Sequence, residues 1–123
     1  MPRIVIAEYN EPQRLSLVIQ LTGLSPGKNY EVHDAEDGEG AFELIQRLES
    51  LDLLITDIEM PRLDGYGLIK RLGGAGYTNP VLVLATYFDR AKVDYNGTIE
   101  FISKMDTSGY GIIKEAVARL LNE

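Results

Sequence analysis

The sequence predicts an α/β fold in which a parallel sheet of five strands lies between two layers of helices. Two observations predict it. Five short apolar runs, typical of strands covered on both faces, alternate with stretches of helical periodicity. No internal repeat, low-complexity tract or linker interrupts the alternation. Strands connected in this way run parallel, and right-handed crossovers place helices on both faces of the sheet.

The first elements follow from apolar runs and capping residues. Residues 3–8, RIVIAE, form a short apolar run that predicts the first strand. Asn10 is a suitable N-cap for the next helix, with Pro12 in its first turn. The segment SPGKN, residues 25–29, is expected to end that helix, and residues 30–34 are expected to form the second strand.

The middle of the chain contains the most regular patterns. Residues 38–50 predict an amphipathic helix, because their apolar side chains fall on one stripe. Residues 51–57 predict the third strand, which ends abruptly on Asp57. A further helix is expected near residues 66–72, closed by GGAG at residues 73–76.

The last part of the chain predicts two strands and one helix. Residues 80–86 and 98–103 form the fourth and fifth apolar runs, and residues 112–121 have a clear helical period. The intervening segment YFDRAKVDYN, residues 87–96, has room for two turns of helix, but its apolar pattern is poor.

Composition excludes several kinds of site. The chain has no cysteine and a single histidine, His33, which excludes disulfides, thiolate zinc sites and multi-histidine metal sites. No apolar run approaches the length of a membrane span, and no signal peptide opens the sequence, so we expect a cytoplasmic protein without a membrane partner. The net charge of −7 disfavours direct binding of nucleic acid and suits protein partners or a cation site.

Three charged residues stand at the C-terminal ends of predicted strands. Glu8, Asp57 and Lys104 end the first, third and fifth strands, and functional groups gather at this edge of a parallel sheet. Two crowded carboxylates favour a hard cation such as Mg²⁺, and an ammonium group attracts an anion. The set therefore predicts a site where a phosphoryl group is placed on an aspartate. The plainer alternatives are a turn-forming Asp57, a surface Lys104, and a Glu8 that is solvated or caps a helix.

The chain resembles the receiver domain of two-component response regulators over essentially its whole length. The stretch LLITDIEMPRLDGYGLIKRL carries the most specific likeness, and RIVIAE, DAEDGEGAFELI, NPVLVLAT and EFISKM match other parts of that family. The resemblance implies a flavodoxin-like (βα)5 fold with strand order 2-1-3-4-5. It also implies a single receiver domain over residues 1–123, with no effector domain.

The resemblance assigns roles to the residues at the strand ends. It makes Asp57 the phosphoacceptor and Lys104 the phosphate-contacting lysine, with Mg²⁺ held by Glu8, Asp57 and the backbone carbonyl of Glu59. Phe101 falls on the aromatic switch position, although plain packing on a half-buried strand would also explain an aromatic residue there.

Other family positions carry unusual residues. Tyr9 stands where a metal-binding acid is usual, so Mg²⁺ is expected to bind weakly; the phenol either fills the metal pocket or faces outward. Ala85 occupies the position of a switch hydroxyl, and the adjacent Thr86 points to the opposite face of a strand. Met105 replaces a proline after Lys104. The span from Ala85 to Lys104 is a few residues short for the family, so a trimmed or misshapen fourth helix is expected.

Three functions remain open from the sequence. The first is a receiver module that is not an enzyme. It takes a phosphoryl group from a histidine kinase or histidine phosphotransfer protein and changes its contacts with a downstream protein or a second copy. Glu59 and Tyr87 then occupy positions that tune the lifetime of the phosphoryl group. The second is a pseudo-receiver that docks proteins without phosphorylation, favoured by Tyr9, Ala85 and the shortened region of the fourth helix. The third is a flavodoxin-like cofactor binder or small hydrolase, which shares the layered architecture.

Overall fold

The computed structural model describes residues 1–22, 30–106 and 111–123, so the predicted helix stop at residues 25–29 lies outside the described residues. The helices and strands are, in chain order, β1 (Arg3–Ala7), α1 (Glu11–Thr22), β2 (Glu31–Ala35), α2 (Gly38–Arg47), β3 (Leu53–Thr56), α3 (Gly65–Gly74), β4 (Val81–Ala85), the 3₁₀ helix η1 (Arg90–Lys92), β5 (Ile99–Ser103) and α4 (Gly111–Leu120). Each predicted strand is present, shifted or shortened by one or two residues at its ends.

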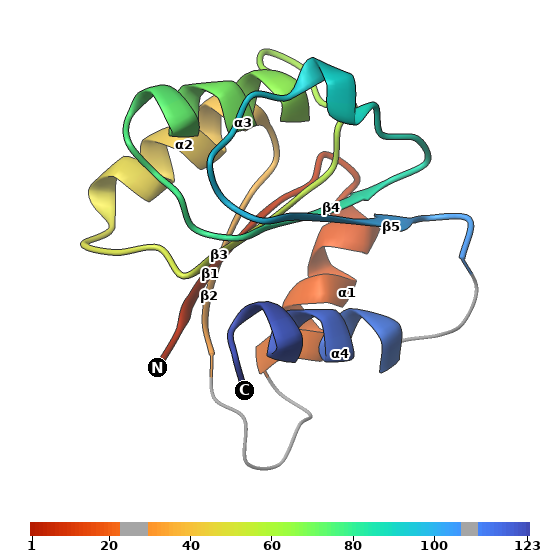
Figure 1. The fold of residues 1–123 in the computed structure, drawn as a ribbon. Helices are drawn as coiled ribbons and strands as arrows, with labels where there is room; N and C mark the ends of the chain where they lie inside the picture. Colours follow the sequence, from red (N-terminus) through yellow and green to blue (C-terminus); the bar gives the residue numbers. More distant parts are fainter. Residues whose placement is uncertain (23–29, 107–110) are drawn as a thin grey trace.

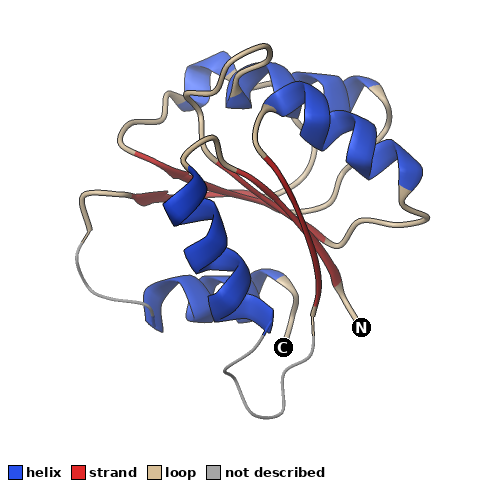
Figure 2. Cartoon of the chain, turned by 180° about the vertical axis from the view of Figure 1, so that it is seen from behind, coloured by secondary structure: helices blue, strands red, loops and turns tan. Residues whose placement is uncertain are grey.

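The five strands form one parallel sheet in the order β2-β1-β3-β4-β5, which confirms the predicted fold class. Helices α2 and α3 and the η1 turn cover one face of the sheet, and α1 and α4 cover the other (Figure 1). The view from behind shows the twisted sheet between these two layers (Figure 2). The parallel direction of all strands brings their C-terminal ends to one edge of the sheet.

Burial follows the position of each strand in the sheet. All residues of β3 and β4 are buried, because helices cover both faces of these central strands. All residues of the edge strand β5 are half-buried. Two apolar cores result, one beneath α2 and α3 and one beneath α1 and α4. The continuous apolar runs in the sequence therefore reflect a sheet that contributes side chains to both cores.

Short polar residues begin the helices next to the strand ends. The Asn10 side chain accepts a hydrogen bond from the Gln13 amide at 3.0 Å, as the sequence predicts for an N-cap. Asp37 and Asp64 cap α2 and α3 in the same way. At Gly65 the chain comes so close to the end of β3 that an added Cβ would lie 2.3 Å from the Asp57 carbonyl oxygen.

The connection between β4 and β5 is trimmed, as the sequence predicts, and the five expected βα units contain only four α-helices among the described residues. A single 3₁₀ turn, η1, stands where a helix was expected between β4 and β5. The Asp89 side chain caps this turn by accepting a hydrogen bond from the Ala91 amide. The segment lacks the apolar stripe that would hold a longer helix on the sheet. No helix in the described parts of the chain is long and apolar enough to cross a membrane.

Candidate functional site

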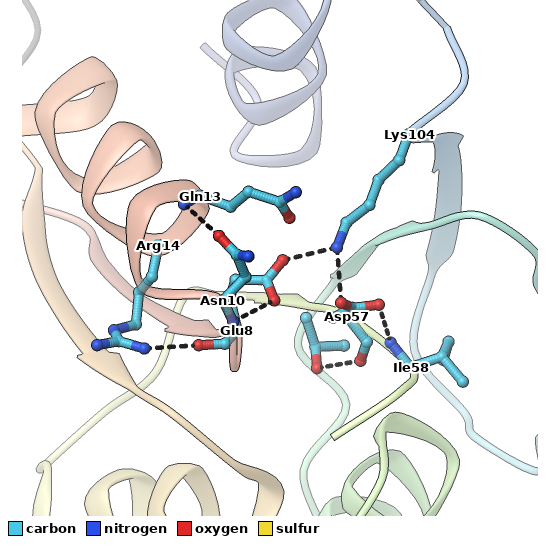
Figure 3. A network of polar contacts seen from close by, with 8 residues as sticks. Glu8, Asn10, Gln13, Arg14, Asp57, Ile58 and Lys104 are labelled. Atoms are coloured by element: carbon cyan, nitrogen blue, oxygen red, sulfur yellow. Dashed lines mark hydrogen bonds and ion pairs between the residues drawn. The ribbon is translucent and has the colours of Figure 1, made fainter. Parts of the chain in front are cut away.

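The sheet positions the three charged residues by extending its hydrogen bonds one residue past the strand ends. The Glu8 amide donates to Ala35 O, and the Asp57 amide donates to Ala7 O, both at 3.0 Å. The Lys104 amide donates to the carbonyl of Ala85 at 2.9 Å. The backbone of each residue is therefore fixed, and the three side chains meet at one point (Figure 3).

Lys104 bridges the two carboxylates. Its Nζ lies 2.7 Å from Glu8 Oε1 and 2.6 Å from Asp57 Oδ2, so residues 47 and 96 positions away in sequence are joined by one ammonium group. The remaining oxygens also have donors, since Glu8 Oε2 accepts from the Asn10 amide and Asp57 Oδ1 accepts from the Ile58 amide. All four carboxylate oxygens are thus hydrogen-bonded within the protein.

The burial of Glu8 distinguishes between its possible roles. Glu8 is only 3% exposed, which excludes a solvated side chain and makes the bond to Lys104 necessary, because an unpaired buried charge is costly. The same side chain holds the Asn10 amide just before α1 begins. Glu8 therefore belongs to the acidic pocket, the site formed by Glu8, Asp57 and Lys104. It also fixes the backbone next to the first helix.

Lys104 remains charged in this setting. Burial by itself would lower the pKa of its ammonium group, but the hydrogen bonds that it donates to Asp57 and Glu8 outweigh burial and raise the pKa above its ordinary value. Lys104 thus supplies a positive charge to the site over the neutral pH range.

Neighbouring residues hold the acidic pocket from behind. The buried Thr56 hydroxyl donates to the Asp57 carbonyl oxygen at 2.7 Å. Arg14 donates from Nη1 to the Glu8 carbonyl oxygen and from Nε to Asp34 Oδ2, both at 2.9 Å. These contacts restrict the backbone on which the two carboxylates stand.

A cavity of about 870 Å³ opens above Asp57. Eight of the residues singled out from the sequence line it: Glu8, Tyr9, Asp57, Glu59, Ala85, Thr86, Tyr87 and Lys104. Phe101, the expected switch residue, does not line this cavity. The structure thus brings together almost the whole predicted set.

The unusual residues singled out from the sequence lie around the mouth of the cavity. Tyr9 is 56% exposed and Tyr87 is 71% exposed, so the Tyr9 ring lies at the mouth and does not fill the acidic pocket. Ala85 ends β4 as a buried methyl group, and Thr86 is exposed just beyond the strand. The position that the family resemblance assigns to a hydroxyl therefore offers no hydrogen bond from its side chain.

Phe101 lies in an aromatic stack. Its ring centroid is 5.8 Å from that of Phe88, which lies 5.8 Å from Tyr66 on its other side. Tyr66 stands at the start of α3 and lines the cavity. The stack links β5 to the rim of the site across the place of the missing helix.

Sequence reasoning did not identify Tyr66 and Lys92, which both line the cavity. Tyr66 directly follows the Asp64-Gly65 pair, and this place in the loop after β3 was its only signal. Lys92 lies in η1, where the sequence has no regular periodicity to indicate which side chains would line the cavity. Their positions depend on how the segment after β4 folds back onto α3.

Few side chains near Asp57 offer oxygen ligands to a metal ion. Among the described residues no group of three or more His, Cys, Asp or Glu side chains is placed to hold a metal ion. Glu8 and Asp57 remain two adjacent carboxylates, which is a set that Mg²⁺ accepts when waters and phosphate oxygens complete its shell. The residues present thus fit a Mg²⁺ ion, provided that Lys104 releases one of its contacts.

Comparison with known families and structures agrees with this arrangement. Residues 4–108 match the family described as response regulator receiver domain. Over 85 residues the chain is 38% identical to the response regulator GtcR of Aneurinibacillus migulanus, a match that covers 69% of this chain and 33% of that protein. The chain spans about a third of that relative, and less than a tenth of two other curated relatives that it matches.

Solved structures show the same fold over almost the whole chain. The signal receiver domain of a signal transduction histidine kinase from Syntrophus aciditrophicus is 29% identical, with a TM-score of 0.77 and coverage of 99% of this chain and 91% of that one. The chemotaxis protein CheY4 of Vibrio cholerae is 21% identical, with a TM-score of 0.81 and coverage of 98% and 99%. The second likeness concerns the fold alone.

Proposed function

Because the chain belongs to the response regulator receiver domain family, the phosphoacceptor modules of two-component signalling, we propose that Asp57 accepts a phosphoryl group from a phosphohistidine. One observation carries the proposal: the Asp57 carboxylate lines an open cavity, and the Lys104 ammonium, which lines the same cavity, lies 2.6 Å from it. A nucleophile and a charge-neutralising cation thus stand at one place.

The transfer requires little from the protein beyond positioning. A carboxylate oxygen of Asp57 attacks phosphorus, and a P–O bond forms as the P–N bond to the donor histidine breaks. The imidazole nitrogen keeps the electron pair of the broken bond and takes a proton from water. Hydrogen bonds from the Ile58 amide and Lys104 orient the carboxylate, so that the attack starts from a fixed geometry.

Positive charge must balance the phosphoryl oxygens. Lys104 supplies one charge, and a Mg²⁺ ion would be held by Glu8, Asp57 and the backbone carbonyl of Glu59. When bound, Mg²⁺ neutralises charge on the phosphoryl oxygens. Tyr9 replaces a carboxylate at this position with a neutral, exposed phenol, so we propose that the ion binds weakly.

A histidine kinase or a histidine phosphotransfer protein is the proposed donor. The receiver domain of a kinase is among the similar structures, which supports this class of partner. After transfer, the new charge would act on Ala85 and Thr86 at the end of β4 and on Phe101 within β5, and a protein partner or a second copy would sense the changed surface. Glu59 and Tyr87 flank the cavity, where they would affect access of water to the phosphoryl group.

Intact mass after incubation with acetyl phosphate and Mg²⁺ tests the proposal, with Asp57→Asn as the matched control. We expect the parent to gain one phosphoryl group and the control to gain none. Absence of an adduct on a folded parent protein would contradict the assignment of Asp57 as phosphoacceptor.

A pseudo-receiver is the second candidate, and a specific observation favours it. Every carboxylate oxygen of Glu8 and Asp57 already has a donor, so the site is satisfied without a metal or phosphoryl group. In this case Asp57 would serve as a structural partner of Lys104, and docking would be independent of phosphorylation. Equal partner binding by the parent before and after incubation with acetyl phosphate and Mg²⁺ would support this function, and binding that requires a phosphoryl adduct would contradict it.

A further inference from the structure

The η1 turn brings a second lysine to the cavity. Lys92 and Lys104 are the two basic residues among those that line it. Lys104 already bridges two carboxylates, whereas Lys92 forms no ion pair with any described residue. Lys92 is exposed, so its ammonium group is available to an anion that enters the cavity.

Several contacts place Lys92 at the rim. Its Nζ lies 5.3 Å from the centre of the Tyr66 ring, within the range of a cation–π interaction. The Tyr66 hydroxyl accepts a hydrogen bond from the Asp89 amide at 2.9 Å, and the Lys92 amide donates to the Asp89 carbonyl oxygen at 3.1 Å. Tyr66 therefore fixes the start of η1 and also lies beneath the lysine side chain.

A phosphoryl group on Asp57 would need more donors than the predicted set provides. An acyl phosphate has three terminal oxygens and one more negative charge than the free carboxylate. The Lys104 ammonium has three N–H groups, and two of them already serve Glu8 and Asp57. Ala85 offers no hydroxyl, and Tyr9 offers no carboxylate through which a metal would add positive charge.

We infer that Lys92 contacts the phosphoryl group of phosphorylated Asp57 and supplies the second protein cation of this site. The inference rests on the proposed function, since it requires phosphorylation of Asp57. The lysine swings from the Tyr66 ring toward a phosphoryl oxygen and forms a charge-assisted hydrogen bond. The trimmed connection between β4 and β5 thus provides a charge that compensates for the residues missing at positions 9 and 85.

The rate of adduct formation with acetyl phosphate tests the inference. In this reaction an Asp57 oxygen bonds to phosphorus, and acetate leaves with the electron pair of the broken P–O bond. Four proteins are compared by intact mass over time, at several Mg²⁺ concentrations and with a chelator: the parent, Lys92→Gln, Lys92→Arg and Lys70→Gln. Lys70 is an exposed lysine on α3 outside the cavity, so its replacement makes the same change in net charge.

We expect Lys92→Gln to form the adduct about five- to tenfold more slowly than the parent, which is the effect of losing one solvent-exposed hydrogen bond. Lys92→Arg should keep most of the parental rate, and Lys70→Gln should match the parent. Added salt should slow the parent more than Lys92→Gln, because it screens the charge that the variant has lost. The deficit of Lys92→Gln should be largest when Mg²⁺ is scarce.

Two results would overturn the inference, and they are distinguishable. Equal rates and equal salt dependence for the parent, Lys92→Gln and Lys70→Gln would exclude the Lys92 contact while leaving Asp57 as phosphoacceptor. Absence of any adduct on the parent would overturn the proposed function and the contact with it, since no phosphoryl group would then exist for Lys92 to hold. Thermal unfolding of all four proteins checks that each is folded.

Discussion

The two sides of the cavity are built differently. On one side, which we call the acidic half, Glu8, Asn10, Asp57 and Ile58 follow the buried strands β1 and β3, and short hydrogen bonds satisfy every carboxylate oxygen. On the other side, the aromatic half, Tyr66 lines the cavity, and the rings of Phe88 and Phe101 stack behind it.

The two halves of the cavity would respond differently to phosphorylation of Asp57. Directional hydrogen bonds to a fixed backbone hold the acidic half, and a small displacement there would cost several contacts at once. Ring packing around one 3₁₀ turn holds the aromatic half, and stacking tolerates small shifts better than hydrogen bonds do. A phosphoryl group on Asp57 would therefore move the aromatic half more easily than the acidic half.

The largest expected effect comes from disturbing the acidic half at Gly65. A Cβ at this position would lie 2.3 Å from the Asp57 carbonyl oxygen and 2.9 Å from Ile58 Cα, both backbone atoms that have little room to move. We expect Gly65→Ala to lower the free energy of unfolding by about 3 kcal/mol, measured by urea denaturation.

Gly74→Ala is the matched control for this prediction. Gly74 ends the same helix, and an added Cβ there meets nothing within 4 Å. Alanine should leave stability unchanged or raise it by about 0.5 kcal/mol through its higher helix propensity. Equal losses for the two variants would show that helix α3, rather than its close approach to β3, determines the effect.

A smaller effect is expected in the aromatic half at Phe88. Its ring stacks on both Tyr66 and Phe101, so Phe88→Ala removes two aromatic contacts and part of the apolar core. We expect a loss of about 2 kcal/mol in the free energy of unfolding, since the residue is only half-buried. Tyr87→Ala, which removes the 71% exposed neighbouring ring, should change stability by less than about 0.5 kcal/mol. A comparable loss at Tyr87 would contradict the assigned role of the stack.

The smallest effect is a pH dependence at Tyr95, which lies outside both halves of the cavity. Burial raises the pKa of Tyr95 to about 12, and its hydroxyl donates to the Asn79 carbonyl oxygen at 2.6 Å. Because the unfolded chain loses this proton near its ordinary pKa of about 10, stability is complete below pH 10 and falls as the pH rises toward 12.

We expect ionisation of Tyr95 to lower the free energy of unfolding by less than about 1 kcal/mol at pH 10.5, relative to its value at neutral pH. Unfolding midpoints in urea between pH 9 and 11 measure it. Tyr95→Phe should flatten the alkaline decline only in part, because burial and the Glu123 contact also raise the pKa of Tyr30 to about 12. An identical decline in the parent and Tyr95→Phe would show that Tyr95 ionises freely in the folded protein.

The sequence alone determined the layered fold and the position of Glu8, Asp57 and Lys104 at one edge of the sheet. Apolar runs predict strands because a strand buried on both faces needs apolar side chains at every position. The first, third and fifth runs stop at charged residues, so parallel strands must bring those residues together. The family resemblance also implied a trimmed helix between Ala85 and Lys104, without indicating what would replace it.

Only the tertiary structure decided how these residues are paired and what fills the space of the missing helix. One ammonium group serves both Glu8 and Asp57, and the stack joins Tyr66, Phe88 and Phe101 from three separate segments. Lys92 likewise reaches the cavity because η1 folds back onto α3. Such contacts join residues 13 or more positions apart and depend on packing, whereas the periodicity of a sequence reports only on neighbours within a few residues of each other.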